Sequence, residues 1–223
     1  MEFEIIRLGS TVNDGIGGIS VLYINFIYSY FLKKEELDFY SFISIVQIVD
    51  DLEETVSKYE NKVGIGLHFL TEGNWNEKGM NEKNNLRLNI IHTGLLQLAE
   101  KDNRFDRSKL EHIRSTIIDS NFIIDVPYSH FTNKLNKDLT GTLIVNADEY
   151  KYDFYFKISR NGVEKCRLFI DSMAAKDFYI GNISFHFDGE WISDNEFLLI
   201  KTDNGNEYKI LANECELKSY FTN

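Results

Sequence analysis

Apolar residues recur at every second position in parts of the first third of the chain, a period typical of β-strands with one buried face. The segment 62–70 shows this period most clearly, because its odd-numbered positions from Val63 to Phe69 are all apolar. Three further segments are rich in aromatic and β-branched residues and are also predicted to be strands. They are residues 2–8, 19–31 and 39–49.

The spacing of apolar residues changes to three and four in the middle of the chain, which predicts helices. One apolar stripe consists of Leu88, Ile91, His92, Leu95, Leu98 and Ala99. After a break at residues 101–106, Asp106 is expected to cap a second helix. The apolar face of that helix contains Leu110, Ile113 and Ile117. Since a short loop joins the two helices, a helical hairpin is predicted over residues 84–120.

Two polar segments flank this region and carry weaker patterns. The acidic residues 50–60 are consistent with a short helix, and the polar, turn-rich residues 74–85 with an exposed connection. The period of two returns from Tyr152 onward, and turn signals at residues 160–162 and 203–206 separate the following segments. The strands predicted there are residues 152–158, 164–170, 178–187, 196–202 and 207–213.

The order of strands, two helices and strands indicates an α+β fold rather than alternating α/β units. We expect a mostly antiparallel, curved sheet system with a central helical hairpin. A chain of 223 residues is long enough for one large domain. The expected single domain, residues 1–223, comprises N-terminal strands in 1–73, the hairpin in 84–120 and antiparallel strands in 121–223.

Charge and cysteine content narrow the classes of function. The chain has 24 Lys and Arg against 35 Asp and Glu, a net charge of −11. This balance argues against direct nucleic-acid binding and against an anionic membrane surface, and it favours basic partners or cations. The first residues do not resemble a signal peptide. Cys166 and Cys215 lie far apart, so we interpret them as ordinary cysteines of a cytoplasmic protein.

No catalytic or metal-binding pattern emerges from the titratable residues. His92 lies within the apolar stripe, and His112 lies roughly 130° from the centre of its own helix's apolar face, so the two do not converge on one metal. His92 is interpreted as a core residue bonded to a backbone carbonyl, and His112 as a surface residue. The glycine-rich segment 13–20 lacks the Lys-Ser/Thr of a phosphate-binding loop. We therefore predict no catalytic residue, metal or cofactor.

Two features nominate contact residues for a protein partner. Asp50, Asp51, Glu53 and Glu54 form an acidic quartet, which is either a solvated turn or a patch that meets a basic partner. A Mg²⁺ site would require a second acidic motif and a basic phosphate clamp, and neither is visible. Trp191 lies in a polar stretch, where a tryptophan either anchors an interface or packs at the base of a loop.

The helical segment and the strands after it resemble a group of bacterial immunity proteins from polymorphic toxin systems. The resemblance rests on a helix pattern R-x4-H-x2-L-L-x2-A, which here comprises Arg87, His92, Leu95, Leu96 and Ala99. It implies a non-catalytic protein that binds a cognate toxin domain tightly. It also implies that Arg87 and His92 are structural and hold the helix to the sheet.

The leading hypothesis is therefore an immunity protein whose partner is a toxin domain, with a basic nuclease as one candidate. Its contact residues are expected to be the acidic quartet and Trp191. One alternative is a small metal- or ligand-dependent enzyme that uses His68, His92 or the quartet. Another is a structural subunit of a larger assembly.

Overall fold

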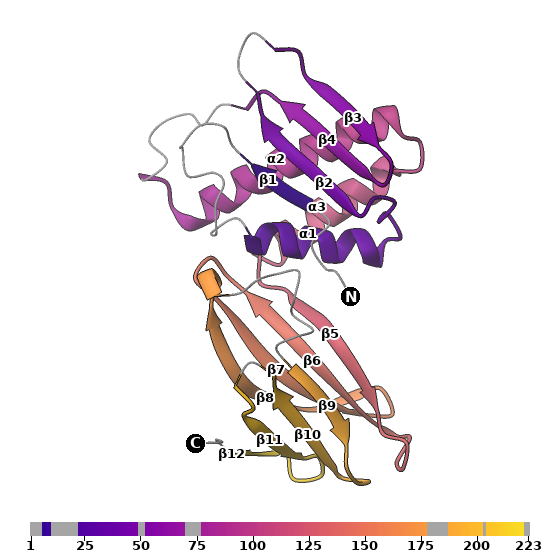
Figure 1. Cartoon of the computed structure of the whole chain (residues 1–223), viewed down its shortest axis with the longest axis vertical. Coiled ribbons are helices and arrows are strands. Elements are labelled where there is room, and N and C mark those ends of the chain that lie inside the picture. Colours follow the sequence, from indigo (N-terminus) through magenta and orange to yellow (C-terminus); the bar gives the residue numbers. More distant parts are fainter. Residues whose placement is uncertain are drawn as a thin grey trace. The chain divides into compact units, whose positions relative to one another are not determined.

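The computed structural model describes residues 6–9, 22–48, 52–69, 77–177, 187–202 and 204–220 (Figure 1). Contacts divide the chain into two compact units, residues 2–124 and residues 125–223. We expected one domain, and the division falls directly after the predicted hairpin. The α+β class and the mostly antiparallel pairing are confirmed. Within the described residues, no helix is long and apolar enough to cross a membrane.

In the unit 2–124, a four-stranded sheet with the order β1-β2-β4-β3 is accompanied by helices. The pairs β1–β2 and β2–β4 are parallel, whereas β3 is an edge strand antiparallel to β4. Helix α1 contacts β1, α2 contacts β3 and β4, and the helices contact one another (Figure 1). The elements are β1 (Ile6–Gly9), α1 (Leu22–Lys34), β2 (Phe42–Gln47), β3 (Thr55–Tyr59), β4 (Lys62–Leu67), α2 (Met80–Lys101) and α3 (Arg107–Asp119).

The predicted strand over residues 19–31 is wrong, because its described part belongs to helix α1. The segment is buried on nearly every side: Tyr23, Ile24, Phe26 and Ile27 are each 3% exposed or less. Its polar residues Asn25 and Ser29 are themselves fully buried, so the helix has no broad polar face and its composition resembles that of a buried strand.

The short helix predicted over residues 50–60 is also wrong, since β3 occupies Thr55–Tyr59. As an edge strand, β3 is mostly exposed, which explains its polar composition. Glu60, with a positive φ of 51°, turns the chain into β4. The strand predicted over residues 62–70 is confirmed by β4, whose alternate residues Val63, Ile65 and Leu67 are buried.

The helical hairpin is confirmed by α2 and α3, which contact each other. Helix α2 begins at Met80, inside the segment predicted as an exposed connection, because its first turn is polar and shows no apolar stripe. Asp106 caps α3 as predicted, accepting hydrogen bonds from the backbone nitrogens of Ser108 and Lys109. Gly94 of α2 permits close packing on β2, since a Cβ there would lie 3.0 Å from Ile45 Cδ1.

The unit 125–223 consists of two antiparallel sheets with the strand orders β5-β6-β7-β8 and β12-β11-β10-β9. The turn at Asn161 and Gly162 between β7 and β8 is confirmed, and both residues have positive φ. The elements are β5 (Asp125–Thr132), β6 (Leu139–Ala147), β7 (Lys151–Arg160), β8 (Val163–Ala174), the 3-10 turn η3 (Ala175–Asp177), β9 (Phe187–Trp191), β10 (Glu196–Lys201), β11 (Glu207–Leu211) and β12 (Glu216–Tyr220).

Aromatic rings join these two sheets into a sandwich. The ring of Phe197 on β10 lies 4.5 Å from that of Phe156 on β7 and 4.8 Å from that of Phe131 on β5, measured between centroids. Phe154 and Phe187 meet in the same way at 4.9 Å. The alternation that predicted β7 therefore marks the face buried between the sheets. Residues 13–20 and most of the strand predicted at 178–187 lie outside the described residues.

The interpretation of the two cysteines as ordinary, unlinked residues is wrong, because Cys166 and Cys215 form a disulfide. Cys166 lies on β8, the edge of one sheet, and Cys215 lies in the turn between β11 and β12 of the other. The bond therefore connects the two sheets covalently. Their separation of 49 residues gave no signal, since pairing is decided by the fold rather than by spacing.

Gly64 and Gly66 test how tightly the sheet β1-β2-β4-β3 is packed on the face opposite the buried residues Val63 and Ile65 of β4. A Cβ at Gly66 would lie 2.9 Å from Ile48 Cγ2, so Gly66→Ala should lower the free energy of unfolding by about 1–2 kcal/mol. Gly64 lies on the same face of the strand and a Cβ there meets nothing within 4 Å. Gly64→Ala should therefore cost nothing in urea denaturation, and equal losses in both variants would contradict this packing.

Candidate functional site

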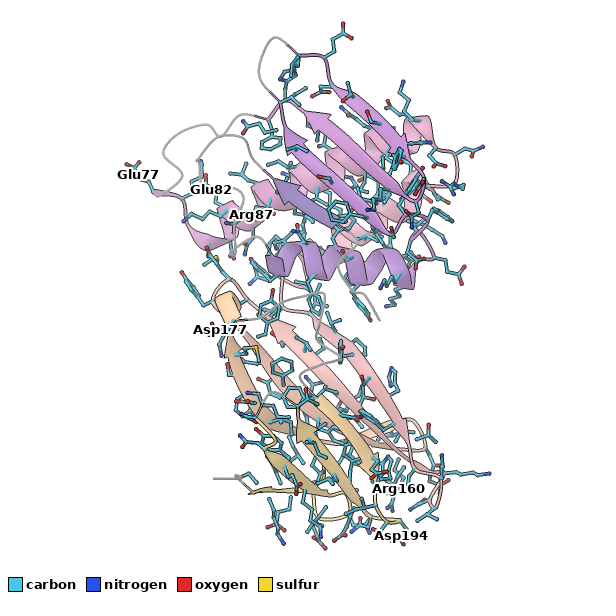
Figure 2. All side chains as sticks on the ribbon, viewed as in Figure 1. Glu77, Glu82, Arg87, Arg160, Asp177 and Asp194 are labelled. Atoms are coloured by element: carbon cyan, nitrogen blue, oxygen red, sulfur yellow. A yellow bond between two sulfur atoms is a disulfide. The ribbon has the colours of Figure 1, made fainter. Side chains whose placement is uncertain are left out.

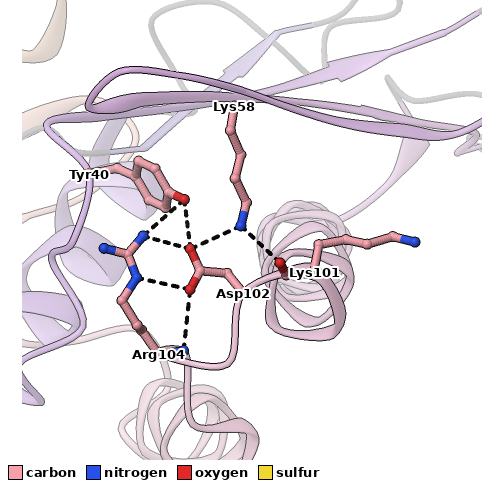
Figure 3. A network of polar contacts seen from close by, with 5 residues as sticks. All are labelled: Tyr40, Lys58, Lys101, Asp102 and Arg104. Carbon is pink, nitrogen blue, oxygen red and sulfur yellow. Dashed lines mark hydrogen bonds and ion pairs between the residues drawn. The ribbon is translucent and has the colours of Figure 1, made fainter.

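Among the described residues of the unit 2–124, the most densely connected polar group is the carboxylate of Asp102, which follows the last turn of α2 (Figure 3). Asp102 is only 7% exposed. Its Oδ2 accepts hydrogen bonds from Tyr40 Oη at 2.6 Å, Arg104 Nη2 at 2.6 Å and Lys58 Nζ at 3.1 Å. Its Oδ1 accepts from Arg104 Nε at 2.9 Å. One carboxylate thus connects the approach to β2, the strand β3 and the loop between α2 and α3.

Arg104 is held in place from two directions. Its guanidinium forms a two-pronged contact with Asp102 and lies 5.0 Å from the ring centroid of Phe39 and 5.2 Å from that of Tyr40. Phe105 packs edge-on against Phe39 and stacks with Tyr40, which fixes both rings. Despite these contacts the Arg104 side chain remains 49% exposed.

The charges of this network reinforce one another. The hydrogen bonds from Arg104, with those from Tyr40 and Lys58, hold the pKa of Asp102 far below its usual range, although burial acts in the opposite direction. The Asp102 carboxylate in turn raises the pKa of Arg104. Burial and the hydrogen bond to Asp102 raise the pKa of the Tyr40 hydroxyl. The carboxylate therefore stays ionised and is unsuited to proton transfer near neutral pH.

The network is suited to binding instead. Arg104 Nη1 has no partner among the described residues, so it remains available to donate to a carbonyl or carboxylate of another molecule. Phe39 is 38% exposed beside it, and the Lys58 side chain is 37% exposed. We call the exposed parts of Phe39, Lys58 and Arg104 the Arg104 surface. Immobilised arginine and aromatic side chains are the residue types that dominate protein interfaces.

One local feature of the sequence indicates the network around Asp102, namely a carboxylate at the C-terminal end of a predicted helix. A carboxylate at the C-terminal end of a helix is unfavourable, because the helix dipole is negative there. Asp102 at the end of an apolar stripe therefore requires compensating cations, and Arg104 two residues later supplies one. The contributions of Tyr40 and Lys58 depend on tertiary structure and have no local signal.

The acidic quartet is only partly described, because Asp50 and Asp51 lie outside the described residues. Glu53 and Glu54 are exposed and precede β3. Glu54 accepts hydrogen bonds from the backbone nitrogen of His68 at 2.9 Å and from Gln97 Nε2 at 2.5 Å. Glu54 therefore fastens its segment to the end of β4 and to α2, whereas Glu53, the other described member of the quartet, stays available on the surface.

Arg87, labelled in Figure 2, and His92 are both buried, at 0% and 6% exposure. His92 Nδ1 lies 3.0 Å from Tyr28 Oη on α1, and its Nε2 lies 3.1 Å from a Glu111 oxygen on α3. The second contact is an ion-pair distance without hydrogen-bond geometry. His92 is thus a core residue that contacts side chains of two other helices, rather than a backbone carbonyl as predicted. His112 is exposed, as predicted.

Trp191 is half-buried at the end of β9 and is engaged inside the sandwich. Its Nε1 donates to the Phe131 carbonyl at 2.9 Å, and its ring packs edge-on against Phe197. These contacts join β9 to β5. The structure therefore favours packing over a role as a free contact residue, the second of the two interpretations left open by the sequence.

His68, a candidate of the enzyme hypothesis, is also used locally. Its Nε2 lies 2.7 Å from the carbonyl oxygen of Leu52, within the segment that Glu54 fastens. In the described part of the chain, no group of three or more His, Cys, Asp and Glu side chains is arranged to hold a metal ion.

Comparisons with protein family models, with curated proteins and with solved structures found no match.

Replacing Asp102 tests whether its charge holds the α2–α3 loop. Asp102→Asn removes an ionised acceptor from three donors and should lower the free energy of unfolding at pH 7 by about 2 kcal/mol. Asp106→Asn in the same loop should be nearly neutral, because asparagine caps helices as well as aspartate does.

Because the pKa of Asp102 is lowered in the folded state, its contribution to stability is present above the unfolded value of 3.8. The gap between wild type and Asp102→Asn in urea denaturation should therefore shrink as the pH falls below about 4.

The buried His92 side chain predicts a second dependence of stability on pH. Here the pKa shift is caused by burial, whereas that of Asp102 is caused by hydrogen bonds. Burial lowers the pKa of His92, although Glu111 acts in the opposite direction. The unfolded state therefore binds a proton that the folded state rejects, and stability should decrease as the pH falls below the unfolded value of 6.5. His92→Gln should flatten this slope between pH 7.5 and 5, and His112→Gln should leave it intact. An NMR titration that found the His92 ring protonated above pH 6.5 would contradict the assignment.

Proposed function

We propose that this chain is an immunity protein that neutralises a cognate bacterial toxin by stoichiometric, non-catalytic binding. The proposal rests on the Arg104 surface. There the Arg104 side chain is immobilised beside the exposed ring of Phe39, and about half of the side chain, 49%, still faces solvent. Immobilising the side chain in advance reduces the entropy lost on binding. Arg87 and His92 of the helix pattern are buried, which agrees with a structural role, but His92 contacts side chains of helices α1 and α3 rather than the sheet named by the resemblance.

The interface is proposed to follow the edge strand β3. Glu53 and Glu54 precede this strand, and Lys58 stands near its other end, so carboxylates and cations are separated by roughly 13 Å along one edge. Such a pattern suits a partner with basic groups facing the acidic end and carbonyl or carboxylate groups facing Arg104. A basic nuclease domain would meet the first requirement. Trp191, which is occupied within the sandwich, is no longer proposed as a main contact.

The alternative of an enzyme gains no support from the arrangement of its candidate residues. His92 is engaged by Tyr28 and Glu111, His68 lies against the Leu52 carbonyl, and Glu54 fastens the chain segment next to it.

The location of the protein in the cytoplasm stays a prediction. The Cys166–Cys215 disulfide counts against it, because disulfides persist mainly in oxidising compartments.

The proposal predicts a single partner that is toxic when separated from this chain. The tagged full-length chain should retain one protein in one-to-one ratio from its native cells, as identified by mass spectrometry. The partner alone should then arrest growth of a bacterial host, and co-expression of this chain should restore growth. A partner that is harmless alone, or self-association without a partner in light scattering, would contradict the proposal.

Substitutions on the β3 edge predict separate effects on affinity and rate. Phe39→Ala and Arg104→Lys should each weaken binding by about tenfold or more, mainly through faster dissociation, because both alter a preordered contact. Reversing the charges of Asp50, Asp51, Glu53 and Glu54 should slow association, most strongly at low salt. Lys137→Ala, an exposed change in the other unit, is the matched control. If surface plasmon resonance found all variants equal to wild type, this placement of the interface would be wrong.

A further inference from the structure

A small cavity lies beside the disulfide of the unit 125–223. It has a volume of about 180 Å³ and is lined by Leu139, Arg160, Lys165, Ala212, Asn213 and Cys215. Two of these six residues are cations and none is acidic, although the whole chain has a net charge of −11. The cavity is smaller than the pockets that hold drug-sized ligands, yet it has room for several water molecules. Its size therefore suits a small ion with part of its hydration shell.

The first cation, Arg160, is oriented by a neutral partner. Arg160 stands at the end of β7 (Figure 2), and its Nη2 donates to Asn213 Oδ1 at 2.6 Å. The backbone nitrogen of Asn213 donates to Asn195 Oδ1 at 2.6 Å, which fixes the turn that carries it. Among the described residues no carboxylate pairs with Arg160, so its positive charge is positioned without being neutralised there, and the Asn213 amide nitrogen is a further potential donor.

The second cation, Lys165, is brought to the cavity by a β-bulge. Ile158 pairs with Cys166 and Ser159 pairs with Glu164, so Lys165 is the extra residue of β8 at this point. A bulge of this kind turns a side chain away from its regular alternation. Among the described residues Lys165 has no ion-pair partner, whereas the neighbouring Glu164 is paired with Arg167. Two cations without an ion-pair partner among the described residues thus line the same cavity.

The disulfide holds the two halves of this cavity together. Lys165 precedes Cys166 on β8, while Asn213 and Cys215 belong to the turn between β11 and β12. Cys215 also has a positive φ of 54°, a conformation that non-glycine residues adopt only when the surrounding structure imposes it. Cleaving the bond would remove the covalent link between the turn that carries Asn213 and the strand that carries Lys165.

We propose that this cavity binds a small oxyanion through Arg160, Lys165 and the Asn213 amide, and that the Cys166–Cys215 disulfide maintains the site. The shared chemistry is that of phosphate and carboxylate, either of which accepts hydrogen bonds from a fork of cationic donors. Reduction by a dithiol transfers two electrons and two protons to the bond. It gives two cysteine thiols, leaves the reductant as its own disulfide, and weakens the site. The inference is independent of the proposed toxin partner.

The test is an NMR titration of the full-length protein with inorganic phosphate at constant ionic strength. The Asn213 side-chain amide and the backbone amides of residues 212–215 should shift and saturate with a dissociation constant of about 1 mM. A parallel titration with acetate distinguishes the ligand source. Saturation by phosphate alone indicates a phosphate group, whereas saturation by both indicates a site that also takes carboxylates.

Amino-acid substitutions and reduction of the Cys166–Cys215 disulfide complete the test of the oxyanion site. Arg160→Gln and Lys165→Gln should each raise the phosphate dissociation constant at least fivefold. Lys157→Gln, on the opposite face of β7, should leave it unchanged. Dithiothreitol, or the double variant Cys166→Ser with Cys215→Ser, should raise it to the level of the Arg160 variant while the spectrum stays dispersed. Shifts that do not saturate, or that persist unchanged in Arg160→Gln and in the reduced protein, would overturn the proposal.

Discussion

The buried carboxylate of Asp102 is the interaction on which the unit 2–124 depends most. Burying an ion is costly unless its oxygens are fully hydrogen-bonded, and Asp102 meets this requirement with donors from three separate parts of the chain. Its position after α2 places a negative charge at the unfavourable end of the helix dipole, so the two cations are needed to offset it. The same contacts that solve this local problem also immobilise Arg104 at the surface. Stability and the proposed binding role therefore come from one network.

The unit 125–223 is held together by different means. Its two sheets meet through closely packed aromatic rings, and Trp191 and the Cys166–Cys215 disulfide add an inter-sheet hydrogen bond and a covalent link. Rings and a disulfide fix strand positions without buried charge, and in the described part of this unit Arg160 and Lys165 have no ion pair, whereas Arg104 is paired with Asp102. The cavity beside the disulfide is thus a consequence of how the sandwich is closed.

Sequence patterns predicted the parts of the fold that have one buried and one exposed face. The stripe from Leu88 to Leu98, the Asp106 cap and the alternation from Tyr152 to Ile158 all correspond to observed elements. The patterns failed where this contrast is absent. Helix α1 is buried on nearly all sides and lacks a broad exposed polar face, and the edge strand β3 is too exposed to show an apolar one.

The candidate sites were less predictable, because they join residues that are distant in sequence. Tyr40 and Lys58 reach Asp102 across 62 and 44 positions, and no local pattern indicates such contacts. The resemblance to immunity proteins drew attention to Arg87 and His92, which are buried, and it gave no information about the surface around Arg104. Glu54 shows the converse: it was chosen for its charge, and its carboxylate is used to fasten the chain.

The proposed function is inhibition of a toxic partner by one-to-one binding of this chain. The most direct measurement is a titration of the purified partner's toxic activity with the purified full-length chain at concentrations far above the dissociation constant. One-to-one inhibition predicts a linear fall to zero activity at one equivalent, with no dependence on incubation time. Complete inactivation by much less than one equivalent, progressing with time, would show turnover and contradict it.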